Sequence, residues 1–474
     1  MTASPSAAPA SSPDGSAVRL CLAVILAAGE GTRMRSSLPK VLHKVGGREM
    51  AAHVLDAAAA AGADGIALVV GHGGERVGKA LAKPAAALDI AYEVFEQRER
   101  RGTAHAVLSA RDALERGAGE VIVLYGDAPL VEPGTIARLR ARLSAGADLA
   151  VLGFEAADPT GYGRLLVEGG RLKAIREEKD ASPAEKAVRL CNSGIIAFRG
   201  AHVLGLLDAI GNANAKGEFY LTDAVEIANA RGLTVEVEVT GEEEVQGVND
   251  RAQLADCEAS FQKRARRRAL AEGATLLAPE TVFFSHDTRL GRDVVVQPNV
   301  VFGPGVSVED GVEILSFSHI EGAHVGRDAR IGPFARLRPG ADLGEKVRVG
   351  NFVEVKAARI EEGAKLNHLS YVGDARVGAG ANIGAGTIVC NYDGTFKHHT
   401  EIGAGAFIGS NSALVAPVTI GDGAYVGTGS VITTDVPADA LAIARGRQVV
   451  KEGRGRAIRE DQARRKAEGG SGSH

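Results

Sequence analysis

The sequence predicts two domains of different fold classes, an α/β domain with a doubly wound, mainly parallel sheet, followed by an all-β domain, a parallel β-helix. In residues 19–248, short apolar runs alternate with helix-forming segments, a pattern typical of a parallel sheet covered by helices on both faces. From Leu290 onward, apolar residues recur at every sixth position. This period is typical of hexapeptide β-helices and of no globular helix or strand.

Composition and charge exclude several functional classes. The 474 residues carry a net charge of −4, which gives no reason to expect nucleic acid or an anionic membrane surface as a partner. No apolar run approaches the roughly 18 residues that cross a bilayer, so we expect no membrane insertion. The four cysteines are far apart and form no C-x-x-C pair, which favours a cytoplasmic location without disulfides. We interpret the Ala/Ser/Pro-rich residues 1–18 as a disordered extension.

A glycine-rich stretch follows the first predicted strand, Leu20–Ile25. It reads Leu-Ala-Ala-Gly-Glu-Gly-Thr-Arg over residues 26–33. Gly29 and Gly31 let backbone N–H groups approach an anion closely, and Arg33 and Lys40 add two cations. The stretch matches neither the dinucleotide nor the P-loop pattern. It predicts a nucleoside triphosphate site, the alternative being an ordinary glycine-rich turn with surface cations.

Further strands predict where this site lies. Gly65–Val70 and Val121–Leu124 are apolar runs of strand length, and we expect one helix over Ala104–Leu114. Ligands of such sheets bind beyond the carboxyl ends of the strands, where Gly29, Gly71 and Asp127 would share one cleft. A carboxylate beside a phosphate-binding turn is a natural Mg²⁺ ligand. The alternative for Asp127 is a turn-capping role before a proline.

Residues 249–274 are helical in pattern and include a basic run over residues 263–268. Because no aromatic residues interleave with these cations, we interpret the segment as a connecting helix between domains and not as a nucleic-acid surface.

The β-helix is predicted over residues 275–448. At about 18 residues per coil, the span Leu290–Ile432 corresponds to roughly eight coils. The longest interruption, Cys390–His399, must leave the coils as a loop, and long insertions on a solenoid commonly carry function. Hexads stop after Pro437, and we expect residues 449–474 to form a mobile tail.

Several motifs taken together resemble one enzyme family, the bifunctional N-acetylglucosamine-1-phosphate uridyltransferase/glucosamine-1-phosphate N-acetyltransferases. The resemblance covers about Leu20 to Lys451 and rests on motifs in both domains. They are Leu26–Met34, Leu38–His43, Leu124–Asp127, Asp158–Arg164, Gly332–Gly340, Gly350–Lys356, Asn382–Thr387 and Cys390–Gly394.

The resemblance implies a Rossmann-like nucleotidyltransferase domain followed by a left-handed parallel β-helix of hexapeptide repeats. It implies an enzyme that acetylates glucosamine 1-phosphate with acetyl-CoA and then transfers UMP from UTP to N-acetylglucosamine 1-phosphate. The product, UDP-N-acetylglucosamine, feeds peptidoglycan and lipopolysaccharide precursors. The resemblance also implies a homotrimer in which neighbouring chains share each acetyl-transfer site.

In the first domain, the resemblance implies that Arg33 and Lys40 face the triphosphate and act in catalysis. Mg²⁺ would be held by Asp127 and Asn249. The residues implied to bind uridine, its phosphates and the sugar are Leu26, Ala27, Ala28, Gly29, Lys40, Gln97, Gly102, Thr103, Tyr125, Gly126, Asp127, Gly163, Glu177, Asn192 and Asn249.

In the second domain, the family's catalytic base falls on His368, which would take a proton from the glucosamine amine, with Glu354 as a candidate to orient it. The residues implied to bind the sugar phosphate are Arg338, Lys356, Tyr371, Asn382, Asn391, Tyr392 and Lys397. Those implied to bind acetyl-CoA are Ala385, Ser410, Thr428 and Arg445.

The chain departs from the family pattern at three places. Arg100 and Arg101 replace the usual Gln-Leu and place charge beside the expected uracil site. Asn367 stands where glycine is usual before the catalytic histidine, and Thr428 where the family often has alanine.

Three alternative functions remain open from the sequence. The first is a nucleotidyltransferase for another sugar 1-phosphate, with the β-helix as an oligomerisation stalk. The second is a binding scaffold built on the solenoid. The third is a β-helix metalloenzyme, which would need converging histidines; the adjacent His398 and His399 point apart if they lie on a strand.

Overall fold

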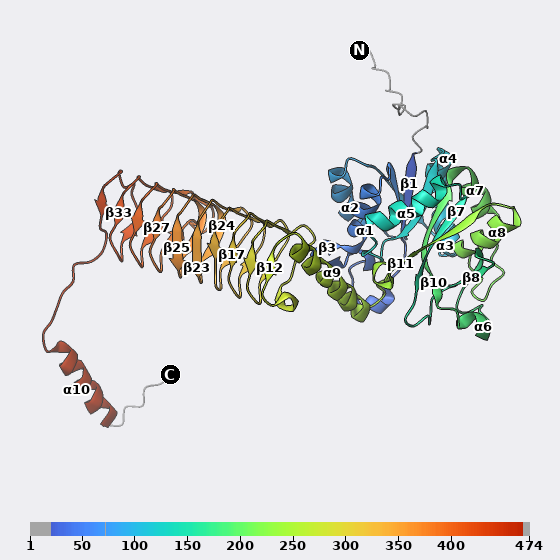
Figure 1. The fold of residues 1–474 in the computed structure, drawn as a ribbon. Coiled ribbons are helices and arrows are strands. Elements are labelled where there is room, and N and C mark those ends of the chain that lie inside the picture. Colours follow the sequence, from blue (N-terminus) through green and yellow to red (C-terminus); the bar gives the residue numbers. More distant parts are fainter. Residues whose placement is uncertain (1–19, 72, 468–474) are drawn as a thin grey trace, which may run out of the picture. The chain divides into compact units, whose positions relative to one another are not determined.

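The computed structural model describes residues 20–71 and 73–467, and the predicted extension over residues 1–18 lies outside them. These residues form two compact units (Figure 1). The α/β unit runs to Arg268 and includes Phe284–Asp287, and the β-helix unit comprises Ala269–Phe283 and the chain from Thr288 onward.

The α/β unit is built on a sheet with the strand order β11-β7-β10-β6-β1-β4-β5. The strand β1 lies in the middle, with β4 parallel to it on one side and β6 parallel on the other. β10 runs antiparallel to β6 and β7, so the sheet is mixed at that side. The strands are β1 (Cys21–Ala27), β4 (Gly65–Gly71), β5 (Ala91–Gln97), β6 (Glu120–Tyr125), β7 (Leu149–Glu155), β8 (Arg164–Glu168), β9 (Arg171–Arg176), β10 (Leu190–Arg199) and β11 (Val235–Thr240), with the small hairpin β2 (Lys44–Val45) and β3 (Arg48–Glu49).

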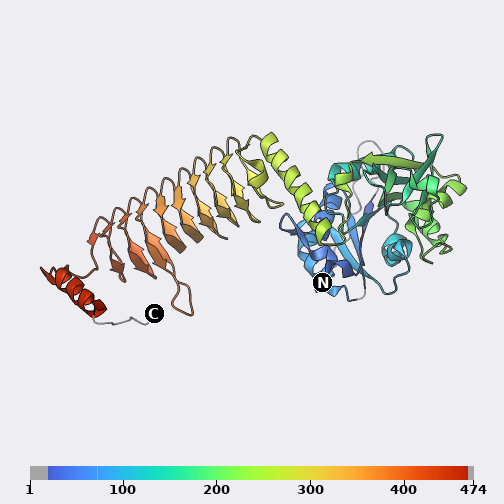
Figure 2. The same ribbon diagram turned by 90° about the horizontal axis from the view of Figure 1, so that it is seen from below.

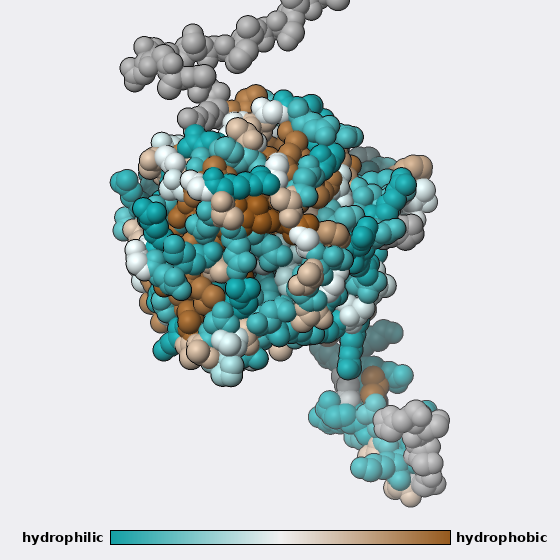
Figure 3. All heavy atoms as spheres, turned by 90° about the vertical axis from the view of Figure 1, so that its right-hand side faces the viewer, coloured by the Kyte–Doolittle hydropathy of each residue, from teal (hydrophilic) through white to brown (hydrophobic). Residues whose placement is uncertain are grey.

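Both faces of this sheet are buried. Along β1, Ala23 and Ile25 belong to one core cluster, while Val24 and Leu26 belong to another. Alternate side chains of a strand point to opposite faces, so helices must cover both sides, as the apolar strands predicted. Figure 3 views this unit from the right-hand side of Figure 1, and mostly hydrophilic side chains there surround a band of hydrophobic ones.

One expected helix is broken. The structure has two short helices in place of one helix over Ala104–Leu114, and Ser109 donates its hydroxyl to the His105 carbonyl at 3.1 Å just before the break. Such back-bonding competes with regular helix geometry. The helices are α1 (Met50–Ala60), α2 (Glu75–Ala87), α3 (Thr103–Leu108), α4 (Arg111–Glu115), α5 (Pro133–Ser144), α6 (Pro183–Lys186), α7 (Gly200–Asp208), α8 (Ala224–Ala230), α9 (Arg251–Ala271) and α10 (Arg454–Ala467), with 3₁₀ turns η1 (Thr32–Met34), η2 (Lys40–Leu42), η3 (Leu221–Asp223), η4 (Glu242–Glu244) and η5 (Pro279–Thr281).

The second unit is a parallel β-helix, as the hexad period predicted. Residues of the apolar series stack on one another in successive coils: Val296 pairs with Ile314, and Ile314 pairs with Ile331. The shorter spacing of the second pair reflects the five-residue step in the sequence. These side chains are almost fully buried, so stacking of coils supplies the core that no single coil has.

One face of the β-helix is a continuous sheet, and two long strands, β24 and β26, run across the corner between the other two faces. The first face contains β12 (Thr275–Leu276), β14 (Val295–Val296), β17 (Glu313–Ile314), β20 (Arg330–Ile331), β23 (Arg348–Asn351), β25 (Lys365–His368), β27 (Asn382–Ile383), β30 (Phe407–Ile408), β33 (Tyr425–Val426) and β35 (Leu441–Ala442). The other faces contain β13 (Arg289–Leu290), β15 (Val301–Phe302), β16 (Ser307–Val308), β18 (His319–Ile320), β19 (Ala323–Val325), β21 (Arg336–Leu337), β22 (Ala341–Leu343), β24 (Glu354–Ile360), β26 (Tyr371–Val377), β28 (Ile388–Cys390), β29 (Thr400–Ile402), β31 (Ala413–Val415), β32 (Val418–Ile420) and β34 (Val431–Ile432).

Candidate functional sites

The first candidate site lies at the carboxyl end of β1. Strands β4 and β6 leave β1 on opposite sides, which makes this the point where the strand order reverses and where such sheets bind ligands. A cavity of about 340 Å³ opens there. Its lining residues are Leu26, Ala27, Ala28, Gly29, Lys40, Val41, Gln97, Arg100, Gly102, Thr103, Ala106, Tyr125, Asp127 and Glu218.

Lys40 connects the two sides of this cavity. Its side chain passes close to Gly31, where a Cβ atom would lie 2.6 Å from the Lys40 Cβ and where φ is +64°. Glycine is therefore required at position 31 for both reasons. The Lys40 ammonium contacts the Asp127 carboxylate and also donates to the Asn249 Oδ1 at 3.1 Å. The two oxygens proposed to hold a metal thus converge on one cation.

The positions of Asp127 and Asn249 show whether these two residues could hold Mg²⁺. Asp127 supplies a carboxylate oxygen and Asn249 an amide oxygen, and Mg²⁺ prefers one or two protein oxygens together with phosphate oxygens and water. Both oxygens already share a positive partner, so the donor set and its placement fit the ion. Among residues 20–71 and 73–467, no group of three or more His, Cys, Asp or Glu side chains is placed to hold a metal.

A second cavity of about 190 Å³ adjoins the first and shares Thr103, Tyr125 and Glu218 with it. Its other lining residues are Glu177, Asn192, Gly194, Ile196, Lys216, Tyr220, Leu221 and Thr222. The Thr222 hydroxyl donates to Glu177 at 3.2 Å, and burial raises the pKa of the Glu177 carboxyl. A buried acceptor of this kind suits the hydroxyl and amide groups of a sugar better than a phosphate.

Four predicted residues of this unit do not line either cavity: Arg33, Gly126, Gly163 and Asn249. Asn249 contacts the first cavity through the Lys40 ammonium. The Gly126 N–H donates to the Leu26 carbonyl at 2.9 Å, and the Gly163 carbonyl accepts from the Asn192 N–H at 2.8 Å. These two glycines hold lining residues in place. Arg33 lies exposed in η1, beyond the turn that brings Lys40 inward.

Sequence reasoning missed Glu218 and Thr222, which lie between α7 and α8 in a segment without a recognisable motif. Of the two unusual arginines, Arg100 lines the first cavity and pairs with Glu30. Arg101 lies over the Phe219 ring, 5.2 Å from its centroid. Of the pair, only Arg100 therefore lies among the lining residues of the described cavities.

The second candidate site follows one edge of the β-helix. The strand register places Asn351, His368, Ala385, Ser410 and Thr428 in successive coils at the same corner. Arg445 extends this column, since its guanidinium donates to the Thr428 carbonyl at 2.6 Å. With about 4.8 Å between coils, Thr428 lies roughly 14 Å along the axis from His368. The residues predicted to bind acetyl-CoA thus form a line that begins at the predicted base.

The partner of His368 differs from the expected one. The Nδ1 atom of His368 lies 2.6 Å from the Asn351 Oδ1. Glu354, the expected orienting residue, accepts from Arg338 at 2.8 Å and pairs with Arg336 at 3.5 Å. The expectation that Glu354 orients His368 is therefore wrong. The Glu354 carboxylate pairs instead with Arg336 and Arg338, because charged guanidinium groups attract it more strongly than a neutral imidazole does.

Most residues predicted to bind the sugar phosphate lie on the adjoining faces or in the hairpin loop, Cys390–His399, and one of them, Asn382, lies on the first face. The Lys397 ammonium lies beside that of Lys356 and lowers the pKa of Lys356. Asn391 donates to the Tyr371 hydroxyl at 3.5 Å, and Tyr392 is exposed in the loop. Asn382 is half-buried in β27. Two neighbouring ammonium groups suit a phosphate, whose charge relieves their repulsion.

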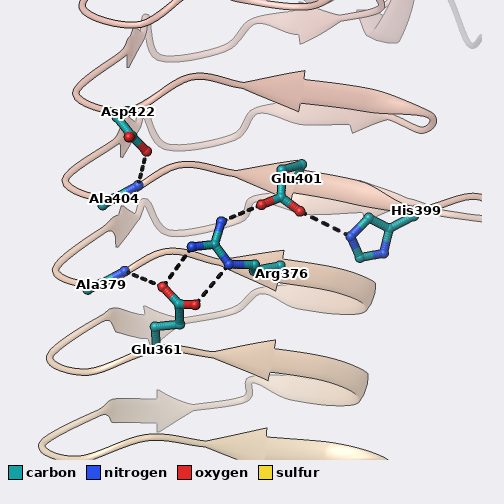
Figure 4. Close-up of polar contacts among 7 residues, drawn as sticks. All are labelled: Glu361, Arg376, Ala379, His399, Glu401, Ala404 and Asp422. Atoms are coloured by element: carbon teal, nitrogen blue, oxygen red, sulfur yellow. Dashed lines mark hydrogen bonds and ion pairs between the residues drawn. The ribbon is translucent and has the colours of Figure 1, made fainter.

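The hairpin loop projects from the coils, as its length predicted, and is visible as the orange loop below the β-helix in Figure 2. It is held internally by the His398 Nε2–Asp393 contact at 2.7 Å, which lowers the pKa of Asp393 to about 2. At its base, Arg376 donates to both oxygens of Glu361 and to Glu401, and Glu401 contacts His399 at 3.3 Å (Figure 4). His398 thus contacts Asp393 and His399 contacts Glu401, so the two imidazoles do not converge on one point.

Comparison with known proteins agrees with this architecture. Residues 23–189 match the model of the MobA-like NTP transferase domain, and residues 399–434 match that of the bacterial transferase hexapeptide (six repeats). The bifunctional protein GlmU of Xanthobacter autotrophicus is 65% identical over 93% of this chain and 98% of its own length. The chain belongs to the GlmU family. The GlmU proteins of Azorhizobium caulinodans and of a Chelativorans species are 62% and 60% identical, over 93% and 96% of this chain and 98% and 99% of their own lengths.

Membership of the GlmU family confirms the function predicted from the motifs, a bifunctional uridyltransferase and acetyltransferase that produces UDP-N-acetylglucosamine. A separate structural finding concerns membranes: within the described part of the chain, no helix is long and apolar enough to cross a bilayer.

Proposed function

We propose that each of the two activities has its own site and that each site is built on a different unit. The observation that carries this proposal is the separation of the two residue sets. The lining of the nucleotide and sugar cavities falls entirely within the α/β unit, and the column from His368 to Arg445 falls entirely within the β-helix unit.

In the α/β unit, the oxygen of N-acetylglucosamine 1-phosphate attacks the α-phosphorus of UTP, and pyrophosphate leaves. This chemistry needs no protein nucleophile, because positioning and charge neutralisation suffice. The glycine-rich turn presents backbone N–H groups to the nucleotide, Lys40 and Arg33 neutralise phosphate charge, and Glu177 with Asn192 orients the sugar. Asp127 and Asn249 would hold Mg²⁺, which supplies further charge neutralisation when bound.

In the β-helix unit, His368 takes a proton from the glucosamine amine as the amine attacks the thioester carbonyl of acetyl-CoA. Lys356 and Lys397 hold the sugar phosphate, and Ala385, Ser410, Thr428 and Arg445 hold the extended cofactor along the edge.

We further propose a cytoplasmic location, which the four free cysteines support.

Product analysis tests this assignment. Purified enzyme is supplied with glucosamine 1-phosphate, acetyl-CoA, UTP and Mg²⁺, and each component is omitted in turn. We expect N-acetylglucosamine 1-phosphate to accumulate without UTP, and no UDP-sugar to form without acetyl-CoA. A UDP-sugar formed from glucosamine 1-phosphate without acetyl-CoA would contradict the proposed order of the two steps.

We also propose that the protein is a homotrimer whose acetyl-transfer sites lie between chains. A ladder of exposed apolar side chains, Phe317, Phe334, Phe352 and Leu369, runs along the corner beside His368, and its rings stack about 5 Å apart. Contiguous exposed apolar side chains commonly mark protein interfaces. A partner packed on this ladder would bring its own residues next to His368.

Mixed trimers test the shared site. Chains carrying His368→Ala and chains carrying Lys397→Ala are co-expressed with different tags and purified on both tags. If a site takes His368 from one chain and Lys397 from the next, one of the three sites in each mixed ring is intact, so acetyl transfer recovers to about a third of the wild-type rate. Absence of recovery in verified mixed trimers would show that one chain supplies both residues.

A further inference from the structure

The contact between His368 and Asn351 determines which imidazole nitrogen can act as a base. The Nδ1 atom of His368 faces the carboxamide oxygen of Asn351 at 2.6 Å. A carboxamide oxygen accepts hydrogen bonds and cannot donate. Nδ1 must therefore carry the proton, and the lone pair of the neutral ring lies on Nε2.

The fold holds this pair in register. Asn351 and His368 are paired residues of the parallel strands β23 and β25, one coil apart. The coils approach closely here, since a Cβ atom at Gly350 would lie 1.9 Å from the Asn367 carbonyl oxygen. Only glycine at position 350 permits this approach, and the approach places the two side chains within hydrogen-bond distance.

The backbone of His368 is also fixed. Its carbonyl accepts from the Ser370 hydroxyl at 2.8 Å and from the Gly386 N–H at 3.3 Å, and the Leu369 N–H donates to the Asn351 carbonyl at 3.0 Å. The remaining freedom of His368 is rotation of its side chain, and Asn351 is the side chain that the structure places on its ring. Glu354, the other candidate, is occupied by Arg338 and Arg336.

We propose that Asn351 is a positioning residue for acetyl transfer, which accepts the Nδ1 proton of His368 and so keeps Nε2 free to receive the substrate proton. The inference rests on the proposed role of His368 as the base. In the step itself, the amine nitrogen bonds to the acetyl carbon, the amine proton passes to Nε2, and the carbon–sulfur bond breaks to release the CoA thiolate. Asn351 touches none of the reacting atoms and acts through the ring alone.

Two substitutions at this position separate positioning from packing. In Asn351→Ala, the ring loses its acceptor, and kcat for acetyl transfer should fall by about 10- to 100-fold, a part of the 10²- to 10⁴-fold that a general base supplies. The KM for glucosamine 1-phosphate should change little, because Asn351 is not among the proposed substrate ligands. In Asn351→Asp, the carboxylate accepts the same proton, so kcat should recover at high pH. Because a carboxylate stabilises the imidazolium form, the acid limb of its pH–rate profile should move up by about one pH unit or more.

The controls use other residues and the other activity of the same chain. Asn367→Ala alters the residue beside His368 and should leave kcat unchanged. Uridylyl transfer should be normal in every variant, which verifies the α/β unit, and an unchanged circular dichroism spectrum and melting curve verify the β-helix. Adding Asn351→Ala to His368→Ala should cause no further loss, since the two residues act as one unit.

Three outcomes overturn the inference. The first is full acetyl-transfer activity in Asn351→Ala. The second is an equal loss of activity in the alanine and aspartate variants with no change in pH profile. The third is an additive loss of activity in the double variant Asn351→Ala/His368→Ala. Full activity in His368→Ala would instead refute the proposed base, so the two failures are distinguishable.

Discussion

Asp127→Ala is expected to abolish uridylyl transfer while acetyl transfer stays near the wild-type rate. Asp127 lies two residues beyond the end of β6, and its carboxylate lines the cavity beside the glycine-rich turn and shares the Lys40 ammonium with Asn249. A metal ion that neutralises phosphate charge contributes several kcal/mol to transition-state stabilisation, so its loss should cost a factor of about 100 or more. The measurement is pyrophosphate release from UTP and N-acetylglucosamine 1-phosphate, beside acetyl-CoA consumption with glucosamine 1-phosphate.

The matched control for this variant is Asp112→Ala, which removes an exposed carboxylate of α4 outside both cavities and should leave both rates unchanged. Parallel loss of both activities in a folded Asp127→Ala protein would contradict two independent sites. Unchanged uridylyl transfer would instead show that Asp127 serves only to cap its turn.

His368→Ala should show the reciprocal effect. Loss of a general base typically costs 10²- to 10⁴-fold in rate, and acetyl transfer should fall within about this range at saturating substrate. Uridylyl transfer to ready-made N-acetylglucosamine 1-phosphate should persist, because no cavity residue of the α/β unit changes. His319→Ala, which removes another exposed histidine of the β-helix, is the matched control and should behave like the wild type. An undiminished acetylation rate in His368→Ala would assign the base to another residue.

The sequence predicted the parts of the fold that depend on periodic burial. The hexad series of Val296, Ile314 and Ile331 became successive coils because each aliphatic side chain can be buried only by the coils above and below it. The apolar run of β1 likewise predicted a strand buried on both faces. The break between α3 and α4 was not predictable from helix propensity, since it coincides with a single back-bonded hydroxyl of Ser109.

The location of the sites was predictable wherever a sequence motif marked it. The hydrogen-bond partners of individual side chains within a site were not predictable from the sequence. The glycine-rich turn and Asp127 indicated a nucleotide cleft, and the structure gathers them around one cavity. By contrast, the choice of Glu354 as the partner of His368 was wrong, because strand register pairs Asn351 with His368 and two arginines occupy Glu354. Competition between partners of this kind depends on which coils are neighbours, a property that sequence spacing alone does not give.

The central claim is that one chain carries two independent sites that act in succession, and mixing two variants tests it most directly. Separately purified Asp127→Ala and His368→Ala proteins are each supplied with glucosamine 1-phosphate, acetyl-CoA, UTP and Mg²⁺, first alone and then together. We predict little UDP-N-acetylglucosamine from either variant alone and substantial synthesis from the mixture, because the acetylated sugar phosphate released by the first variant is the substrate of the second. A mixture as inactive as its components, with both proteins folded, would contradict the claim.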